Sequence, residues 1–134
     1  MHRVTRIGYR AVMQRRTLRR HVGGQKAAGA HHSVYVVQLD PAVAKLKRVR
    51  TLNPDRDPDK PCVYVGMTGL TLEKRFQNHK NGTKASSYVK RFGRSFLPAL
   101  YAHLNPMPYE QACVMERELA EDLRHAGYTV TGGH

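Results

Sequence analysis

The order of apolar and polar residues along this chain predicts short strands that alternate with helices. Residues 33–39 and 62–66 are nearly continuous runs of β-branched and apolar side chains, typical of buried strands, and the first is expected to be central in its sheet. A last short strand is predicted at residues 128–130. Residues 96–101 are also apolar, but Pro98 among them indicates an edge strand or an extended segment.

The predicted helices are marked by the residues at their ends. Three segments start at a Ser, Thr or Pro and stop at a glycine, which are common helix boundaries: residues 71–82, 86–93 and 108–127. Asp40 followed by Pro41 opens a further helix, which is expected to reach about residue 49. A polar loop with three prolines then leads to the second strand.

The composition indicates a polyanionic partner. The 134 residues carry a net charge of +13 and a pI near 10.3, which is typical of proteins that bind nucleic acid, although a solvated basic surface without a partner has the same composition. Residues 1–33 hold eight Lys or Arg and no acid, whereas residues 107–134 hold five acids and two basic residues. A polyanion is therefore expected to contact the first two-thirds of the chain.

The elements indicate one α+β domain over residues 33–134, preceded by a basic N-terminal extension over residues 1–32. In the extension, arginines surround a thin apolar stripe. A basic helix along a phosphate backbone, a tail without a specific role and a targeting peptide all have this pattern. On the first interpretation, four arginines contact phosphate: Arg15, Arg16, Arg19 and Arg20.

Two features of the sequence bear on the compartment. Cys62 and Cys113 lie in apolar contexts without the spacing of a zinc site, so both are expected to be reduced core residues of a cytoplasmic protein, nucleoid-associated or not. No run is apolar enough for a membrane span, and the basic start lacks the apolar core of a secretory signal. We therefore expect no membrane partner.

Some polar residues fall on helix faces that the pattern assigns to the core. Within residues 71–82, Arg75 and His79 share one face with Leu72 and Phe76. A charged group on such a face needs partners, because burying an unpaired charge is costly. Arg75 and His79 are therefore candidates for a functional site.

The helix predicted within residues 108–127 holds a further candidate. Glu116 lies in its apolar stripe, where the carboxylate must be neutralised by a cation. That cation is either a metal ion or a basic side chain, for example Arg75 in a structural ion pair. Tyr35 and Tyr64 lie mid-strand between valines, and each taken alone is best interpreted as a core aromatic residue.

Taken together, these residues resemble the motifs of the GIY-YIG nuclease superfamily. The segments Val34-Tyr35-Val36 and Tyr64-Val65-Gly66 stand where that family has its two strand motifs. Arg75 follows eleven residues after the second tyrosine, and His79 comes one helical turn later. Glu116 matches the carboxylate of the family's metal-binding helix.

The resemblance covers the predicted domain and implies a small, three-stranded, mostly antiparallel sheet flanked by helices. It implies that Glu116 holds one Mg²⁺ or Mn²⁺ ion. Tyr64 would deprotonate or position the attacking water, with Tyr35 in support. Arg75 would hold the scissile phosphate, and His79 would be a proton carrier or a second phosphate contact.

The sequence departs from the family's pattern in several places. Ser33 stands where the first motif has a glycine, and Met67 stands where some relatives have a lysine. Where many members have an asparagine, the nearest candidates are Thr129 and Thr131. Residues 40–61 form an insertion whose basic residues belong either to a substrate-contacting helix or to a solvated one.

We therefore expect a metal-dependent endonuclease that acts on DNA in preference to RNA, and the sequence does not separate single-stranded from double-stranded substrates. Outside the extension, basic residues near the motifs are the expected nucleic-acid contacts: Lys74, Lys80, Lys84, Lys90 and Arg91. The alternatives are a non-catalytic nucleic-acid-binding protein on the same scaffold and an RNase. No small-molecule cofactor is expected, and the oligomeric state is left open.

Overall fold

The computed structural model describes residues 29–82 and 86–134, so the four arginines of the extension and Lys84 lie outside the described residues. Two connecting 3-10 helices, η2 and η3, separate the third strand from the last helix. In chain order the elements are β1 (Ser33–Leu39), η1 (Pro41–Lys45), α2 (Lys47–Leu52), β2 (Cys62–Thr68), α3 (Leu72–Asn81), α4 (Ser87–Phe92), β3 (Gly93–Phe96), η2 (Pro98–Leu100), η3 (Ala102–Leu104), α5 (Tyr109–His125) and β4 (Thr129–Gly132).

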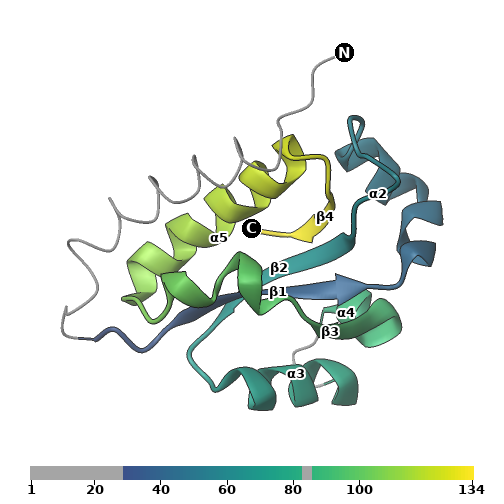
Figure 1. The fold of residues 1–134 in the computed structure, drawn as a ribbon. Coiled ribbons are helices and arrows are strands. Elements are labelled where there is room, and N and C mark those ends of the chain that lie inside the picture. Colours follow the sequence, from purple (N-terminus) through teal and green to yellow (C-terminus); the bar gives the residue numbers. More distant parts are fainter. Residues whose placement is uncertain (1–28, 83–85) are drawn as a thin grey trace.

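The described strands form one mixed sheet in the order β3-β1-β2-β4 (Figure 1). β1 pairs antiparallel with both β2 and β3, which confirms its predicted central position. β2 pairs parallel with β4. The α+β class is therefore confirmed, while the sheet of the described residues has four strands rather than the three that were expected.

β3 is the strand that the hydrophobic pattern did not mark. Its sequence, GRSF, has no apolar run, and its side chains are only partly buried or exposed because it lies at the edge of the sheet. The apolar stretch that follows forms η2 instead of a strand. Pro98 stands at the start of η2, and it has no N–H to contribute to a strand ladder.

The single helix predicted after Asp40 is instead broken in two. Leu46 is extended between η1 and α2, with φ −75° and ψ 125°. Val43 and Val49 are both fully buried, yet six positions in one α-helix would turn them about 120° apart. The break lets both valines pack into the core.

The other predicted helix boundaries are confirmed by their caps. The Thr71 side chain accepts the backbone N–H of Lys74 at the start of α3, and Gly82 ends that helix in the left-handed region at φ 85°. Ser86 caps α4 with its hydroxyl, and α5 has the predicted limits. Among the described residues no helix has the length and apolar character needed to cross a membrane.

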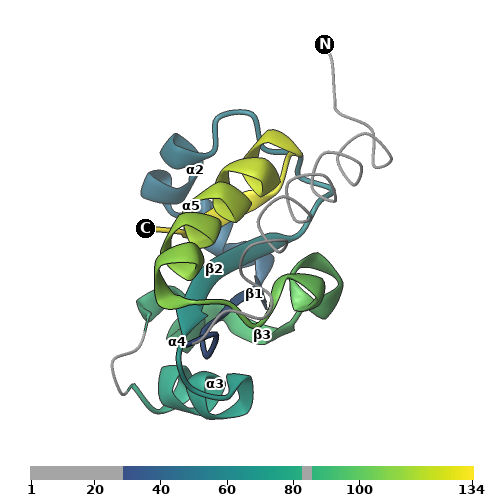
Figure 2. The same ribbon diagram turned by 90° about the vertical axis from the view of Figure 1, so that its left-hand side faces the viewer.

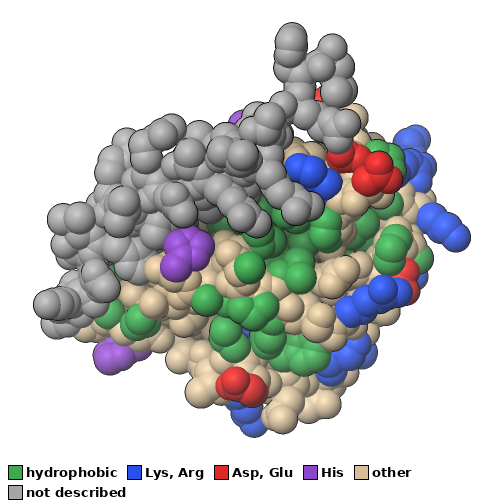
Figure 3. Space-filling view, viewed as in Figure 1, with side chains coloured by type: hydrophobic (Ala, Val, Ile, Leu, Met, Phe, Trp, Pro, Cys, Tyr) green, Lys and Arg blue, Asp and Glu red, His purple; other side chains and the backbone are tan. Residues whose placement is uncertain are grey.

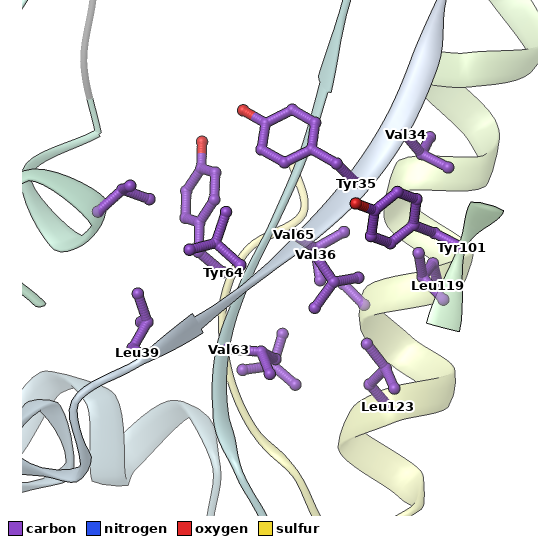
Figure 4. Packing of buried hydrophobic residues seen from close by; sticks show 14 of the residues in the cluster. Val34, Tyr35, Val36, Leu39, Val63, Tyr64, Val65, Tyr101, Leu119 and Leu123 are labelled. Atoms are coloured by element: carbon purple, nitrogen blue, oxygen red, sulfur yellow. The ribbon is translucent and has the colours of Figure 1, made fainter. Parts of the chain in front are cut away.

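The helices lie on both faces of the sheet (Figures 1 and 2). Successive strand residues point to opposite faces, so the valines and the tyrosines of β1 and β2 are separated. Figure 4 shows the valines on the side of Leu119 and Leu123 of α5, and shows Tyr35 and Tyr64 pointing away from that helix. The valines concerned are Val34, Val36, Val63 and Val65. The tyrosines are therefore available to α3 and α4.

Candidate active site

Two tyrosines from adjacent strands lie side by side on the face away from α5. Tyr35 stands opposite Gly66 in the strand pairing, and Tyr64 stands opposite Val37. Their ring centroids are 6.2 Å apart. A Cβ atom at Gly66 would lie 2.6 Å from the Tyr35 hydroxyl oxygen and 2.8 Å from a ring carbon of Tyr64. The tyrosine pair therefore explains why glycine follows the second tyrosine motif.

His79, on α3, is fully buried and is hydrogen-bonded at both ring nitrogens. Its Nδ1 accepts the backbone N–H of Ser86 at 3.0 Å, and its Nε2 lies 2.8 Å from the Tyr35 hydroxyl oxygen. Because a backbone N–H can only donate, the imidazole proton must be on Nε2, which donates it to Tyr35. Burial, and then the charge of Arg75, lower the pKa of His79 to about 4, so the ring is neutral near pH 7.

Arg75, one turn before His79, approaches the same hydroxyl group. Its Nε donates to the Tyr35 oxygen at 3.4 Å, and no described carboxylate forms an ion pair with it. The Tyr35 oxygen thus accepts hydrogen bonds from His79 and Arg75, which leaves its own hydrogen to be donated elsewhere. Burial, and next the neighbouring Tyr64, raise the pKa of Tyr35, so that hydrogen is retained.

Tyr64 lies next to Tyr35, and its surroundings also shift its pKa. Burial, followed by the nearby Glu116 carboxylate, raises the pKa of Tyr64. Hydrogen-bonding contacts from the Ser86 and Tyr35 side chains act in the opposite direction, as donors to a phenol oxygen do. The hydrogen bonds of the site therefore run from the Ser86 backbone through His79 to Tyr35, next to Tyr64.

Glu116, on α5, is 8% exposed. Burial raises its pKa to about 7, and only the charge of the neighbouring Arg117 acts against this shift. The ion pair with Arg75 that the sequence left open does not form in the described residues. Glu116 lies near enough to Tyr35 and Tyr64 to raise the pKa of both phenols. Its carboxylate is therefore a buried acid within electrostatic range of both tyrosines, and no described cation forms an ion pair with it.

A cavity of about 330 Å³ opens beside Tyr64. Arg75 and His134 give its lining a guanidinium and an imidazole group, and no described Asp or Glu side chain lines it. Such a lining suits an anionic group such as a phosphate. The lining consists of Tyr64, Arg75, Ser86, Ser87, Tyr88, Gly132 and His134. Of the predicted catalytic residues, Tyr64 and Arg75 thus face the cavity, and Tyr35 and His79 support them.

Five of the seven cavity residues are not among the predicted site residues: Ser86, Ser87, Tyr88, Gly132 and His134. Ser86 is marked in the sequence only as a helix cap, and its Oγ does accept the N–H groups of Tyr88 and Val89 at 3.2 and 3.5 Å. Its contacts with His79 and Tyr64 join separate elements, so local spacing does not reveal them. Tyr88 and His134 have no local signal of a site, because only the fold brings them to the cavity.

A second cavity, of about 810 Å³, lies between residues 53–58 and the C-terminal end of α5. Its lining mixes acids with bases, and Arg124 is held there by Glu121 at 3.7 Å and by the Asn53 side-chain oxygen at 3.3 Å. None of the polar residues that fall on predicted core faces lines it. We therefore assign the candidate site to the smaller cavity.

Glu116 is the described residue that the resemblance assigns to a metal ion, and it does not line the cavity. Mg²⁺ commonly binds through one or two carboxylates, keeps several waters and takes further oxygens from substrate phosphates. Glu116 is a buried carboxylate with which no described cation forms an ion pair, and the described part of the chain has no group of three His, Cys, Asp or Glu that could hold a metal ion. A metal ion is therefore expected to bind weakly alone and more tightly together with a phosphate.

Basic side chains surround the helices next to the cavity. Of the predicted nucleic-acid contacts, Lys74, Lys90 and Arg91 are exposed. Lys80 is also exposed, and its Nζ donates to the backbone carbonyl of Gly93 at 3.2 Å, which ties α3 to β3. Figure 3 shows Lys and Arg side chains gathered on the side of the molecule that carries α2 and α4.

Comparisons of the chain with protein-family models, with curated proteins and with solved structures found no match. The function must therefore be argued from the site itself. Tyr64 and Arg75 belong both to the motifs and to the cavity lining.

Proposed function

We propose that this chain is a divalent-metal-dependent endonuclease of the GIY-YIG type that hydrolyses phosphodiester bonds in DNA. One arrangement carries the proposal: Tyr64 and Arg75 line a cavity that no described Asp or Glu side chain lines, and Tyr35, itself held by His79, accepts a hydrogen bond from Arg75. Glu116 is a buried acid close enough to influence the pKa of both tyrosines. A structural core requires neither an arginine without a carboxylate partner nor a buried acid without a cation.

The fold supports the same family assignment. β1 and β2 bring the two tyrosine motifs together although an insertion separates them in sequence. α3 then supplies Arg75 and His79, and α5 supplies Glu116. We infer a GIY-YIG-like core made of β1, β2 and β4 with α3 and α5, to which β3 and the insertion are additions.

Arg75 is the residue proposed to hold the scissile phosphate. Its Nε is engaged with the Tyr35 hydroxyl, which leaves the terminal nitrogens of the guanidinium to donate to phosphate oxygens. A fixed guanidinium stabilises the charge that develops on those oxygens as the bond to the leaving oxygen breaks. Its orientation by Tyr35 reduces the reorganisation required in the transition state.

Tyr64 is proposed to orient the attacking water. Its side chain lines the cavity together with Arg75, so its hydroxyl group can contact a water molecule bound there. Since burial raises the pKa of Tyr64, the group is a phenol near pH 7 and acts first by positioning. His79 is buried and neutral, and we assign it the role of fixing Tyr35 rather than of contacting phosphate.

Glu116 is the residue that would hold the divalent cation. When bound there, the cation would stabilise negative charge on the phosphate and acidify a water molecule. The residues around Glu116 contribute the low-polarity setting in which such a charge acts strongly. DNA is proposed as the substrate on the strength of the family resemblance.

The test is a cleavage assay on end-labelled single-stranded DNA, duplex DNA and RNA, with Mg²⁺, Mn²⁺ or EDTA. We expect cutting that EDTA abolishes and that Glu116→Gln lowers by at least about 100-fold. Glu110→Gln is the matched control, since Glu110 is an exposed acid on the same helix and its loss changes the net charge equally. Cutting of RNA alone would move the proposal to an RNase. Tight, salt-sensitive binding without any cutting would favour the non-catalytic protein.

A further inference from the structure

Tyr88 connects the cavity to the inserted helix α2. Its side chain lines the cavity together with Tyr64 and Arg75, and it is only partly buried. The guanidinium carbon of Arg48, on α2, lies over the Tyr88 ring at 5.5 Å from the centroid. The insertion, which the sequence left as either substrate-contacting or solvated, therefore reaches the rim of the proposed active site.

We propose that Tyr88, held by Arg48, is a nucleobase-stacking subsite next to the phosphate position at Arg75. The proposal rests on the proposed function and deepens it, since it names single-stranded or locally unpaired DNA as the substrate. A base can stack on a protein ring only after it leaves its neighbours in a duplex. Stacking on aromatic side chains is the usual way in which proteins bind unpaired strands without reading their sequence.

The charges around Tyr88 fit a nucleic-acid strand. α2 has three basic residues and no acid. Arg50 is occupied, because it donates to the backbone carbonyls of Ala44 and Lys45 at 3.2 and 2.5 Å. Lys47 and Arg48 are exposed, and no described acid pairs with them. These two side chains can therefore contact phosphates that flank a base on Tyr88.

The size of the cavity also fits more than a phosphate. Its volume is about 330 Å³, at the lower end of the range of roughly 300–1,000 Å³ that small-molecule sites span. A phosphate group has only five heavy atoms and would occupy one part of that space, at Arg75. Tyr88 and Ser87 belong to the same lining, so the sugar and base of an adjacent nucleotide could share the cavity with that phosphate.

A cation over the ring is compatible with a stacked base. An arginine on an exposed aromatic face orients the ring and makes it a better stacking partner while its guanidinium stays in solvent. Arg48 is itself exposed, so the pair forms without burying its charge. Tyr88 also packs against the hydrophobic core, so Arg48 and the core together hold the part of its side chain that lines the cavity.

The experiment measures binding without cleavage. The full chain in EDTA is titrated with an oligodeoxythymidine strand and with an abasic strand of the same length and charge. We expect the wild type to bind the strand with bases at least about fivefold more tightly. Tyr88→Phe keeps the ring and should retain that ratio, whereas Tyr88→Leu should bring it to within about twofold. A preference for bases that survives in Tyr88→Leu would overturn the proposal.

A second measurement uses only the wild type and so does not depend on how the variants fold. A single strand that carries the fluorescent base 2-aminopurine should lose fluorescence on binding, because stacking quenches this base. Unchanged fluorescence at saturating protein would overturn the subsite. Both the binding ratio and the fluorescence are measured without cutting. If both show stacking but the protein cuts no substrate, the result contradicts the proposed nuclease activity and leaves the subsite standing. Cutting without any base preference contradicts the subsite alone.

Discussion

The Nε2–H of His79 donates to the hydroxyl oxygen of Tyr35 across 2.8 Å, while the backbone N–H of Ser86 occupies the other ring nitrogen. One imidazole therefore joins α3, β1 and the start of α4. Because Nδ1 can accept the Ser86 N–H only when it carries no proton, protonation of His79 would break the contact with Ser86. The geometry of the tyrosine pair is thus tied to the charge state of a buried residue.

The first prediction concerns stability at acid pH. The pKa of His79 is about 4 in the folded protein and about 6.5 in an unfolded chain, so the unfolded state takes up the proton first. The stability that this residue contributes is complete above pH 6.5 and is lost as the pH falls through 4. We expect the wild type to lose about 3 kcal/mol of unfolding free energy from this residue over that range.

The measurement is urea unfolding at pH 7 and at pH 4.5 for the wild type and for His79→Gln, which cannot take up a proton. The carboxylates contribute equally in both proteins, so the difference between them isolates His79. His125→Gln, near the end of α5, is the control histidine substitution. An equal loss of stability in the wild type and in His79→Gln would show that the imidazole is not held neutral.

The second prediction separates the two tyrosines. Tyr35→Phe removes the acceptor of two donors and leaves a buried imidazole N–H without a partner, which should cost about 1–3 kcal/mol of unfolding free energy. Tyr64→Phe leaves no buried donor of α3 unsatisfied, so it should destabilise less. Its rate of DNA cleavage should nevertheless fall by about 100-fold or more, since Tyr64 faces the cavity.

Thermal unfolding together with single-turnover cleavage checks this contrast. Tyr128→Phe, a tyrosine outside the cavity lining, serves as the control for loss of a hydroxyl. If Tyr35→Phe cut DNA faster than Tyr64→Phe but the two variants had the same unfolding free energy, only the catalytic half of the prediction would hold. If Tyr64→Phe cut DNA at the wild-type rate, Tyr64 would have no part in orienting the water.

The third prediction tests the close approach of the backbone to the tyrosine pair. In Gly66→Ala, the new methyl group would lie 2.6 Å from the Tyr35 hydroxyl oxygen and 2.8 Å from the Tyr64 ring, so the rings must move. Overpacking of this kind typically costs about 1–3 kcal/mol. Gly69→Ala is the matched control, because its methyl group would meet only the His32 side chain at 3.1 Å. Equal unfolding midpoints for the two variants would contradict the packing.

The polar candidates could be predicted because a helix has a fixed period. Arg75 and His79 fall on the apolar face of α3, and Glu116 falls in the apolar stripe of α5, and the structure finds His79 and Glu116 buried. Caps likewise fix helix limits from local chemistry alone, which is why Thr71 and Gly82 bound α3 as predicted. Local periodicity thus identifies polar residues at helix positions that normally hold apolar core residues.

The features that the sequence did not reveal depend on contacts between distant segments. β3 forms a strand because it pairs with β1, although its own sequence has no strand pattern. The break at Leu46 follows from the core positions of Val43 and Val49, and not from a helix-breaking residue. His134 enters the cavity lining only because β4 pairs with β2. No local spacing contains such information.

The last prediction separates a functional acid from a structural one at Glu116. Burial raises the pKa of this carboxylate to about 7, so its charged form is held at a cost in the protein without metal. Glu116→Gln replaces the acid with a neutral group of the same shape. At pH 8 in EDTA we therefore expect the variant to be more stable than the wild type by about 1–2 kcal/mol.

A structural ion pair at Glu116 would give the opposite sign, because the amide would leave a buried cation unpaired. Urea unfolding of the wild type and Glu116→Gln, with Glu110→Gln as the exposed control on the same helix, distinguishes the two. Addition of Mg²⁺ with a short DNA strand should then stabilise the wild type and not the variant. If Glu116→Gln is more stable than the wild type and is no longer stabilised by Mg²⁺ with DNA, the carboxylate serves to bind a ligand. If the variant is less stable than the wild type, the carboxylate serves to stabilise the fold.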